Sequence, residues 1–137
     1  MTSGAPAGSP MRVGVVGLGY WGPNLARNLD RLPGAELRWL CDGSEAARAR
    51  AAPGFPGVRL SAELDELLAD PDLDAVVVAT HVPSHAELTL RVLAAGKHCF
   101  VEKPLALRVA DAERAVAAAR AAGRTLMVGH LLEYHPG

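Results

Sequence analysis

The sequence has few of the features that mark secreted, membrane-spanning or nucleic-acid-binding proteins. Only two cysteines, Cys41 and Cys99, occur in 137 residues, and neither lies in a metal-binding spacing, so we expect buried, reduced thiols. No uninterrupted apolar run is longer than residues 75–79, whereas a membrane helix needs about 20 residues. The net charge is −1, without a basic stripe. These absences favour a cytoplasmic protein without a nucleic-acid or membrane partner.

The length suits one domain with a substantial core. Half of the residues are apolar and 21% are charged, as in folded globular domains. Residues 1–10 have neither the positive cluster nor the apolar stretch of a secretory signal and are predicted to be a disordered lead-in. No internal boundary interrupts residues 11–130, which we expect to form a single domain.

Strand-like apolar segments alternate with segments of helical composition along the chain. The expected strands are 11–16, 36–41, 58–60, 74–79, 97–101 and 124–128. The expected helices are 23–31, 44–52, 61–69, 84–95 and 108–122. Single helices between consecutive strands predict βαβ crossovers, hence an α/β protein with a doubly wound parallel sheet of six strands, a Rossmann fold. The expected strand order is 3-2-1-4-5-6.

Residues 17–22 match G-x-G-x-x-G between the first expected strand and helix. In such a loop Gly17 permits the tight turn, Gly19 admits a pyrophosphate, and Gly22 lets helix and strand pack closely. Free N–H groups and the positive end of the helix dipole favour phosphate. The alternative is a tight turn that binds no ligand. The predicted cofactor-binding residues of this loop are Gly17, Leu18, Gly19, Tyr20, Trp21 and Gly22.

Asp42 lies 20 residues after Gly22, at the end of the second expected strand. A carboxylate there accepts hydrogen bonds from the adenosine ribose and repels a 2′-phosphate, which favours NAD(H) over NADP(H). No arginine follows Asp42 immediately, and Arg48 and Arg50 lie on the next expected helix. The alternative is that Asp42 caps this helix, for which Ser44 is another candidate.

Further polar residues follow the strands at their carboxyl ends, where open α/β sheets bind ligands. They are Thr80, His81, His85, Glu102, Lys103 and His130. No two-histidine-plus-carboxylate set is recognised, so the sequence predicts no metal site.

Several segments together resemble the N-terminal domain of the Gfo/Idh/MocA oxidoreductase family, which includes glucose–fructose oxidoreductase and inositol 2-dehydrogenase. They are GLGYWG at 17–22, Asp42, VVVATHVPSH at 76–85, AGKHCFVEKPLAL at 95–107 and VGHLLEYHP at 128–136. The Glu-Lys-Pro strand is more specific than the glycine loop. GLGYWGPNLARN also resembles the branch that oxidises sugar nucleotides at C3.

The resemblance implies that Lys103 is catalytic and lies near the nicotinamide and the reacting hydroxyl, often before a cis peptide at Pro104. A lysine pKa of about 10.4 suits a base at pH 7 poorly, but burial lowers such values. As an ammonium, Lys103 would polarise the hydroxyl oxygen. The alternative is an exposed lysine at a strand end.

The other strand-end residues carry implied roles beside structural alternatives. Glu102 contacts the nicotinamide ribose or caps a helix, and Thr80 hydrogen-bonds the cofactor or is structural. His85, counted with the cofactor-binding residues, matches a family histidine near the start of the following helix, or it caps a loop. His81, counted with the cofactor-binding residues, stands where the family usually has proline. His130 lines the substrate site or is structural.

The resemblance implies hydride transfer between NAD and a secondary hydroxyl of a sugar, sugar nucleotide or cyclitol. The family's second domain supplies substrate contacts and much of the oligomer interface, and residues 131–137 resemble the crossing into it. We therefore expect these 137 residues to bind NAD(H) without efficient turnover. The alternatives are a freestanding NAD(H)-binding or redox-sensing module, or a remnant that only folds. Homo-oligomer and partner-subunit arrangements both stay open.

Overall fold

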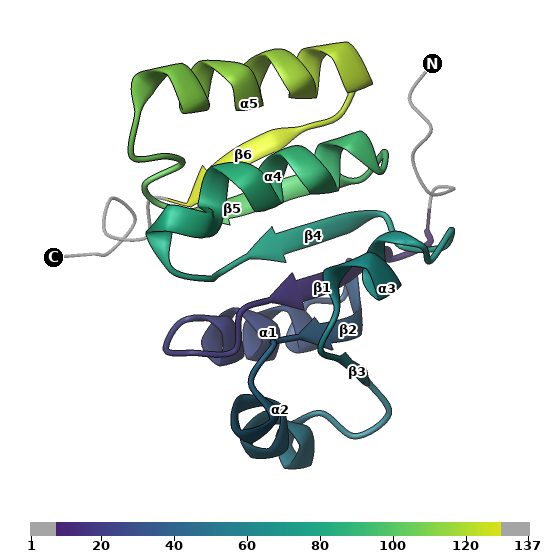
Figure 1. The fold of residues 1–137 in the computed structure, drawn as a ribbon. Coiled ribbons are helices and arrows are strands. Elements are labelled where there is room, and N and C mark those ends of the chain that lie inside the picture. The colour runs from purple at the N-terminus through teal and green to yellow at the C-terminus, as the bar shows by residue number, and fades with distance from the viewer. Residues whose placement is uncertain (1–7, 130–137) are drawn as a thin grey trace, which may run out of the picture.

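A computed structural model describes residues 8–129 as one parallel sheet with helices on both faces (Figure 1). The strands are β1 (Met11–Val16), β2 (Ala35–Cys41), β3 (Arg59–Ser61), β4 (Ala75–Val78), β5 (His98–Glu102) and β6 (Leu126–Gly129). They pair in the order β3-β2-β1-β4-β5-β6, and every pair is parallel. The predicted doubly wound order is therefore confirmed.

Each connection between consecutive strands contains a helix, within a few residues of the expected position. The helices are α1 (Gly22–Arg31), α2 (Glu45–Ala51), α3 (Leu64–Leu68), α4 (His85–Ala94) and α5 (Val109–Ala122), with 3₁₀ turns η1 (Ala52–Gly54) and η2 (Val82–Ser84). Ser44 caps α2, because its Oγ accepts a hydrogen bond from the Ala47 N–H. Gly123 ends α5 in the left-handed conformation with φ +63°. These boundaries follow from local chemistry.

The unbroken valine runs are explained by two separate cores, one on each face of the sheet. Side chains of a strand alternate between its faces. In β4, Val76 and Val78 belong to the core under α3, α4 and α5, whereas Val77 belongs to the core under α1 and α2. Both cysteines are buried, as predicted, and burial raises the pKa of both the Cys41 and Cys99 thiols to about 11. They are therefore protonated at neutral pH.

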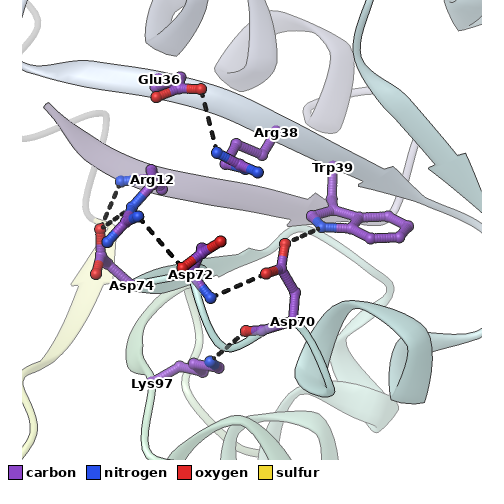
Figure 2. A network of polar contacts seen from close by, with 8 residues as sticks. All are labelled: Arg12, Glu36, Arg38, Trp39, Asp70, Asp72, Asp74 and Lys97. Carbon is purple, nitrogen blue, oxygen red and sulfur yellow. Dashed lines mark hydrogen bonds and ion pairs between the residues drawn. The ribbon is translucent and has the colours of Figure 1, made fainter.

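A polar network lies near the amino ends of β1, β4 and β5, at the end of the sheet opposite the glycine loop (Figure 2). The backbone N–H and Nε of Arg12 in β1 donate to Asp74 Oδ2 at 2.8 and 3.2 Å, just before β4. Trp39 Nε1 of β2 donates to Asp70 Oδ2 at 2.8 Å, and the buried Lys97 Nζ donates to the Asp70 carbonyl at 2.7 Å. These contacts stabilise the fold and leave the carboxyl ends of the strands free for a site.

The strand order reverses between β1 and β4, because the chain builds outward from β1 to β3 on one side and from β4 to β6 on the other. Ligands of such folds bind outside the carboxyl ends of the strands at this reversal. Among residues 8–129, no helix is long and apolar enough to cross a membrane.

Candidate functional site

A cleft of about 750 Å³ opens at this reversal point, beyond the carboxyl ends of β1, β2 and β4. This main cleft is lined by the glycine loop (residues 17–22), the turn after β2 and the turn after β4. A second hollow of about 460 Å³, the lysine pocket, lies beside it and contains Glu102 and Lys103. Trp21, Thr80 and His81 line both. The two hollows therefore adjoin.

The three motif glycines are required for different reasons. Gly17 has φ +99°, and a Cβ on it would lie 2.6 Å from the carbonyl carbon and oxygen of Ala79. A Cβ on Gly22 would overlap the carbonyl oxygen of Gly17. Gly19 has no positive φ, and no described atom lies within 4 Å of the position that its Cβ would take. Packing thus fixes Gly17 and Gly22, whereas Gly19 leaves bare backbone at the cleft.

The start of α1 is suited to an anion. The Trp21 side chain makes no capping hydrogen bond to α1, and Pro23 occupies its first turn. First-turn N–H groups without a protein partner are available to an anion, which the helix dipole also favours. Tyr20 and Trp21 pack edge to face with ring centroids 5.0 Å apart and remain 79% and 47% exposed. Both residues line the main cleft.

Asp42 ties the turn after β2 to the glycine loop. Its Oδ2 accepts a hydrogen bond from the Leu18 N–H at 2.7 Å, and its Oδ1 accepts one from the Ser44 N–H at 2.8 Å. The cap of α2 is Ser44, so the capping alternative for Asp42 is wrong. Asp42 lines the main cleft, where the ribose contact stays a prediction.

Arg50 lines the main cleft, although the sequence predicted no site role for it. It lines the main cleft together with Asp42, as well as a neighbouring hollow of about 270 Å³ beside Gly19. Arg48 instead donates from Nη1 to the Asp42 carbonyl at 2.7 Å. The spacing of the two arginines along α2 carries no signal that separates these roles.

Glu102 and Lys103 end β5 beside the lysine pocket. The Lys103–Pro104 peptide is cis, as the resemblance implied, and Lys103 is exposed. Glu102 is only 7% exposed, and its Oε1 finds no hydrogen-bond partner in the described part of the chain. Burial raises the pKa of Glu102, which the Lys103 N–H and the charges of His85 and Lys103 offset only in part. Arg108 occupies the cap position of α5, so the helix-cap alternative for Glu102 is wrong.

His85 is buried, and both of its ring nitrogens face backbone carbonyl oxygens. Nε2 lies 2.7 Å from the Thr80 oxygen, and Nδ1 lies 2.8 Å from the Pro104 oxygen. These contacts support the alternative that His85 caps a loop, while a direct cofactor contact stays a prediction. The Thr80 hydroxyl hydrogen-bonds Ser84 Oγ at 2.6 Å, and the exposed His81 lines both hollows.

Some predictions lie outside the described residues. These are the placement of His130, the crossing segment 131–137 and most of the lead-in, residues 1–7. Within residues 8–129, no group of three or more His, Cys, Asp or Glu side chains is arranged to hold a metal ion.

Comparison with known proteins identifies a family. The Gfo/Idh/MocA family model, described as an oxidoreductase family with an NAD-binding Rossmann fold, matches residues 11–130. Inositol 2-dehydrogenase 3 of Saccharopolyspora erythraea is 40% identical over 129 residues, which cover 93% of this chain and 38% of that protein.

Two solved structures show the same arrangement of elements. GenD2 from gentamicin A biosynthesis, in complex with NAD, has a TM-score of 0.89 at 37% identity over 99% of this chain and 39% of its own. The WlbA dehydrogenase of Bordetella pertussis, in complex with NADH and UDP-GlcNAcA, has a TM-score of 0.83 at 34% identity over 88% of this chain and 35% of its own. The chain thus spans little more than a third of the length of these relatives.

Proposed function

This chain belongs to the Gfo/Idh/MocA oxidoreductase family through its NAD-binding Rossmann domain, and we propose that the main cleft holds NAD(H). The pyrophosphate rests on the glycine loop, because Gly19 presents backbone to space that a Cβ would otherwise fill. No packing or dihedral constraint within residues 8–129 requires glycine at this position. This single observation carries the proposal.

The two ends of the cofactor are distinguished by what lies on either side of the glycine loop. The adenosine ribose lies at Asp42, whose carboxylate accepts from its hydroxyls in addition to two backbone N–H groups. The nicotinamide lies toward the lysine pocket, where Thr80, His81 and Glu102 are its neighbours. The adjoining hollows give a dinucleotide a continuous path between these ends.

The reaction we propose is hydride transfer between NAD(H) and a secondary hydroxyl of a sugar, sugar nucleotide or cyclitol. Bound nicotinamide supplies the hydride acceptor or donor. Lys103 holds the hydroxyl proton at Nζ or polarises the hydroxyl oxygen. The inositol and sugar-nucleotide relatives support this substrate class. Because Lys103 is exposed, the transfer becomes efficient only when water is excluded from it.

Calorimetric titration with NAD⁺, NADH and NADP⁺ tests the proposal. Gly19→Ala should weaken NAD⁺ binding roughly tenfold or more, about 1.4 kcal/mol, because the new methyl group occupies the pyrophosphate position. Gly34→Ala is the matched control, since Gly34 also has an unconstrained φ and no described atom within 4 Å of its Cβ position. Gly34 lies in the turn between α1 and β2, so the Gly34→Ala variant should bind NAD⁺ with the wild-type affinity.

A second variant tests the adenosine end. Asp42→Ala should weaken NAD⁺ binding more than NADP⁺ binding, because the carboxylate that accepts from the ribose and repels the 2′-phosphate is removed. Equal NAD⁺ affinity in the wild type and Gly19→Ala would contradict the placement of the pyrophosphate. A wild-type preference for NADP⁺ would contradict the role of Asp42.

A further inference from the structure

The smaller hollow beside Gly19, which we call the arginine hollow, lies outside the path proposed for the dinucleotide. It measures about 270 Å³ and is lined by residues of α1, of α2 and of the turn that joins β1 to α1. Gly19, Ala47 and Arg50 line both this hollow and the main cleft. A molecule in the main cleft can therefore place one of its groups in the arginine hollow.

Arginine supplies every charged side chain among the described residues that line this hollow. The two are Arg27 of α1 and Arg50 of α2. Within residues 8–129, neither guanidinium forms an ion pair with a carboxylate, although four other arginines do. Arg27 Nη1 donates to Asn24 Oδ1 at 2.8 Å, which leaves further N–H groups of the guanidinium for a ligand. Two such groups at one hollow favour an anion, and their planar donors match the oxygens of a phosphate.

The walls of the arginine hollow are part of the packed fold. The buried residues that line it are Leu18, Ala47, Ala51 and Phe55. Gly19 adds bare backbone where the hollow meets the main cleft. No acidic side chain of the described residues lines the hollow. The charges of the two guanidinium groups are therefore not compensated there and are available to a bound anion.

The adenosine ribose proposed at Asp42 lies next to this hollow. The Asp42 carboxylate accepts a hydrogen bond from the Leu18 N–H at 2.7 Å, and Leu18 lines the arginine hollow. Arg50 lines the main cleft together with Asp42. A phosphate on the 2′-oxygen of this ribose would therefore have access to the hollow. An arginine near the ribose accommodates a 2′-phosphate in folds that bind dinucleotides.

We propose that the arginine hollow is a phosphate subsite that accepts the 2′-phosphate of NADP(H), with Arg27 and Arg50 as its charged contacts. The proposal rests on the proposed function, because it needs the adenosine ribose at Asp42. Asp42 repels the 2′-phosphate and keeps a preference for NAD⁺, and the two guanidinium groups offset part of this repulsion. The chain should therefore bind both cofactors, with NAD⁺ preferred by less than about tenfold.

Titration calorimetry with 5′-AMP and 2′,5′-ADP isolates the subsite, because these nucleotides differ only in the 2′-phosphate. The wild type should bind the two with affinities within about tenfold of each other. Arg50→Ala should weaken 2′,5′-ADP binding roughly threefold or more and change 5′-AMP binding little, since an exposed charge-assisted contact is lost. Arg27→Ala should act in the same direction.

Arg31→Ala is the matched control for both variants. It removes the same charge from the exposed last residue of α1, which lines neither the arginine hollow nor the main cleft. The ratio of its affinities for the two nucleotides should equal that of the wild type. The full cofactors should follow the same pattern, so Arg50→Ala should widen the preference for NAD⁺ over NADP⁺ and Arg31→Ala should not.

The possible failures are distinguishable. If the wild type binds neither NAD⁺ nor 5′-AMP, the proposed function fails and the phosphate subsite fails with it. If NAD⁺ binds but Arg50→Ala and Arg27→Ala leave the ratio of nucleotide affinities unchanged, only the subsite is wrong. If inorganic phosphate binding depends on Arg50 while that ratio does not, the hollow takes free phosphate and the proposal is likewise wrong. If Arg50→Ala does not fold, Arg27→Ala makes the same test.

Discussion

Some residues are required by the fold itself, whereas others would be required only by a bound ligand. Gly17 and Gly22 are needed because atoms of the protein itself occupy the space of a side chain. Gly19 is required by no described atom and by no positive φ, which supports the proposed pyrophosphate contact at the main cleft. Glu102 is a second example, because its buried Oε1 has no hydrogen-bond partner within residues 8–129 and an unpaired buried carboxylate oxygen weakens folding.

Glu102→Gln should stabilise the chain without cofactor at neutral pH. Burial raises the pKa of Glu102 above its unfolded value, so folding favours the protonated form. Its contribution is fully present below the unfolded value of about 4.3 and is lost as pH rises through the folded value. Thermal unfolding should give a higher melting temperature for Glu102→Gln at pH 7 and a much smaller difference at pH 4.

The same substitution at an exposed glutamate is the control for this prediction. Glu113→Gln makes the same chemical change on the exposed side of α5 and should alter the melting temperature little at either pH. A lower melting temperature of Glu102→Gln at pH 7 would mean that its ionised carboxylate stabilises the fold.

At the scale of elements, polar contacts hold the beginnings of β1 and β4 together. Asp74 fixes the start of β4 to β1 through the backbone N–H and the guanidinium of Arg12 (Figure 2). Burial acts to raise the pKa of Asp74, but the hydrogen bonds and charge of Arg12 outweigh it and lower the pKa. Asp74 is therefore expected to stabilise the fold as an anion.

Asp74→Ala should lower the free energy of unfolding by about 1.5–3 kcal/mol at pH 7, a typical value for hydrogen bonds to a charged group. Because the folded pKa is depressed, this contribution is present above about pH 3.9 and is lost as pH falls through the folded value. Urea unfolding at pH 7 and pH 3 measures both effects.

Asp72→Ala is the matched control for Asp74→Ala. Asp72 lies 3.7 Å from Arg12 with its side chain 61% exposed, so its removal should cost less than about 1 kcal/mol. Its backbone N–H bond to Asp70 survives the substitution. Equal losses for Asp72→Ala and Asp74→Ala would show that the network does not depend on the partly buried Arg12–Asp74 contact.

Element boundaries were predicted where a local signal exists and missed where a neighbouring element intervenes. Gly123 and Ser44 mark the ends of helices by their own chemistry. The expected helix 61–69 is shorter because Ser61 pairs with Cys41 as the last residue of β3. The expected helix 84–95 begins one residue later, at His85, because residues 82–84 form the 3₁₀ turn η2. Strand pairing of this kind is not visible in local sequence.

For the molecule as a whole, cofactor binding should be linked to folding. The main cleft combines the ends of β1, β2 and β4, which come together only in the folded chain. NAD⁺ at 100 times its dissociation constant should therefore add about 2.7 kcal/mol to the free energy of unfolding. We expect the melting temperature to rise by roughly 5–15 °C for a domain of this size.

Circular dichroism melting with and without NAD⁺ checks this linkage. Gly34→Ala should keep the full rise, whereas Gly19→Ala should show little of it at the same NAD⁺ concentration, with an unchanged melting temperature in its absence. A rise of the same size in Gly19→Ala would place the cofactor away from the glycine loop.

The sequence by itself determined the class, order and direction of the elements, because alternating helices and doubly buried valine strands allow few other arrangements. It also predicted the glycine loop, because the spacing of Gly17, Gly19 and Gly22 is typical of the tight turn between a strand and a helix. The tertiary structure alone decided that Arg50 reaches the cleft, that Glu102 Oε1 lacks a partner within residues 8–129, and that His85 lies between two carbonyls. These facts depend on which strand ends become neighbours and how their turns meet, and no local pattern records those distances.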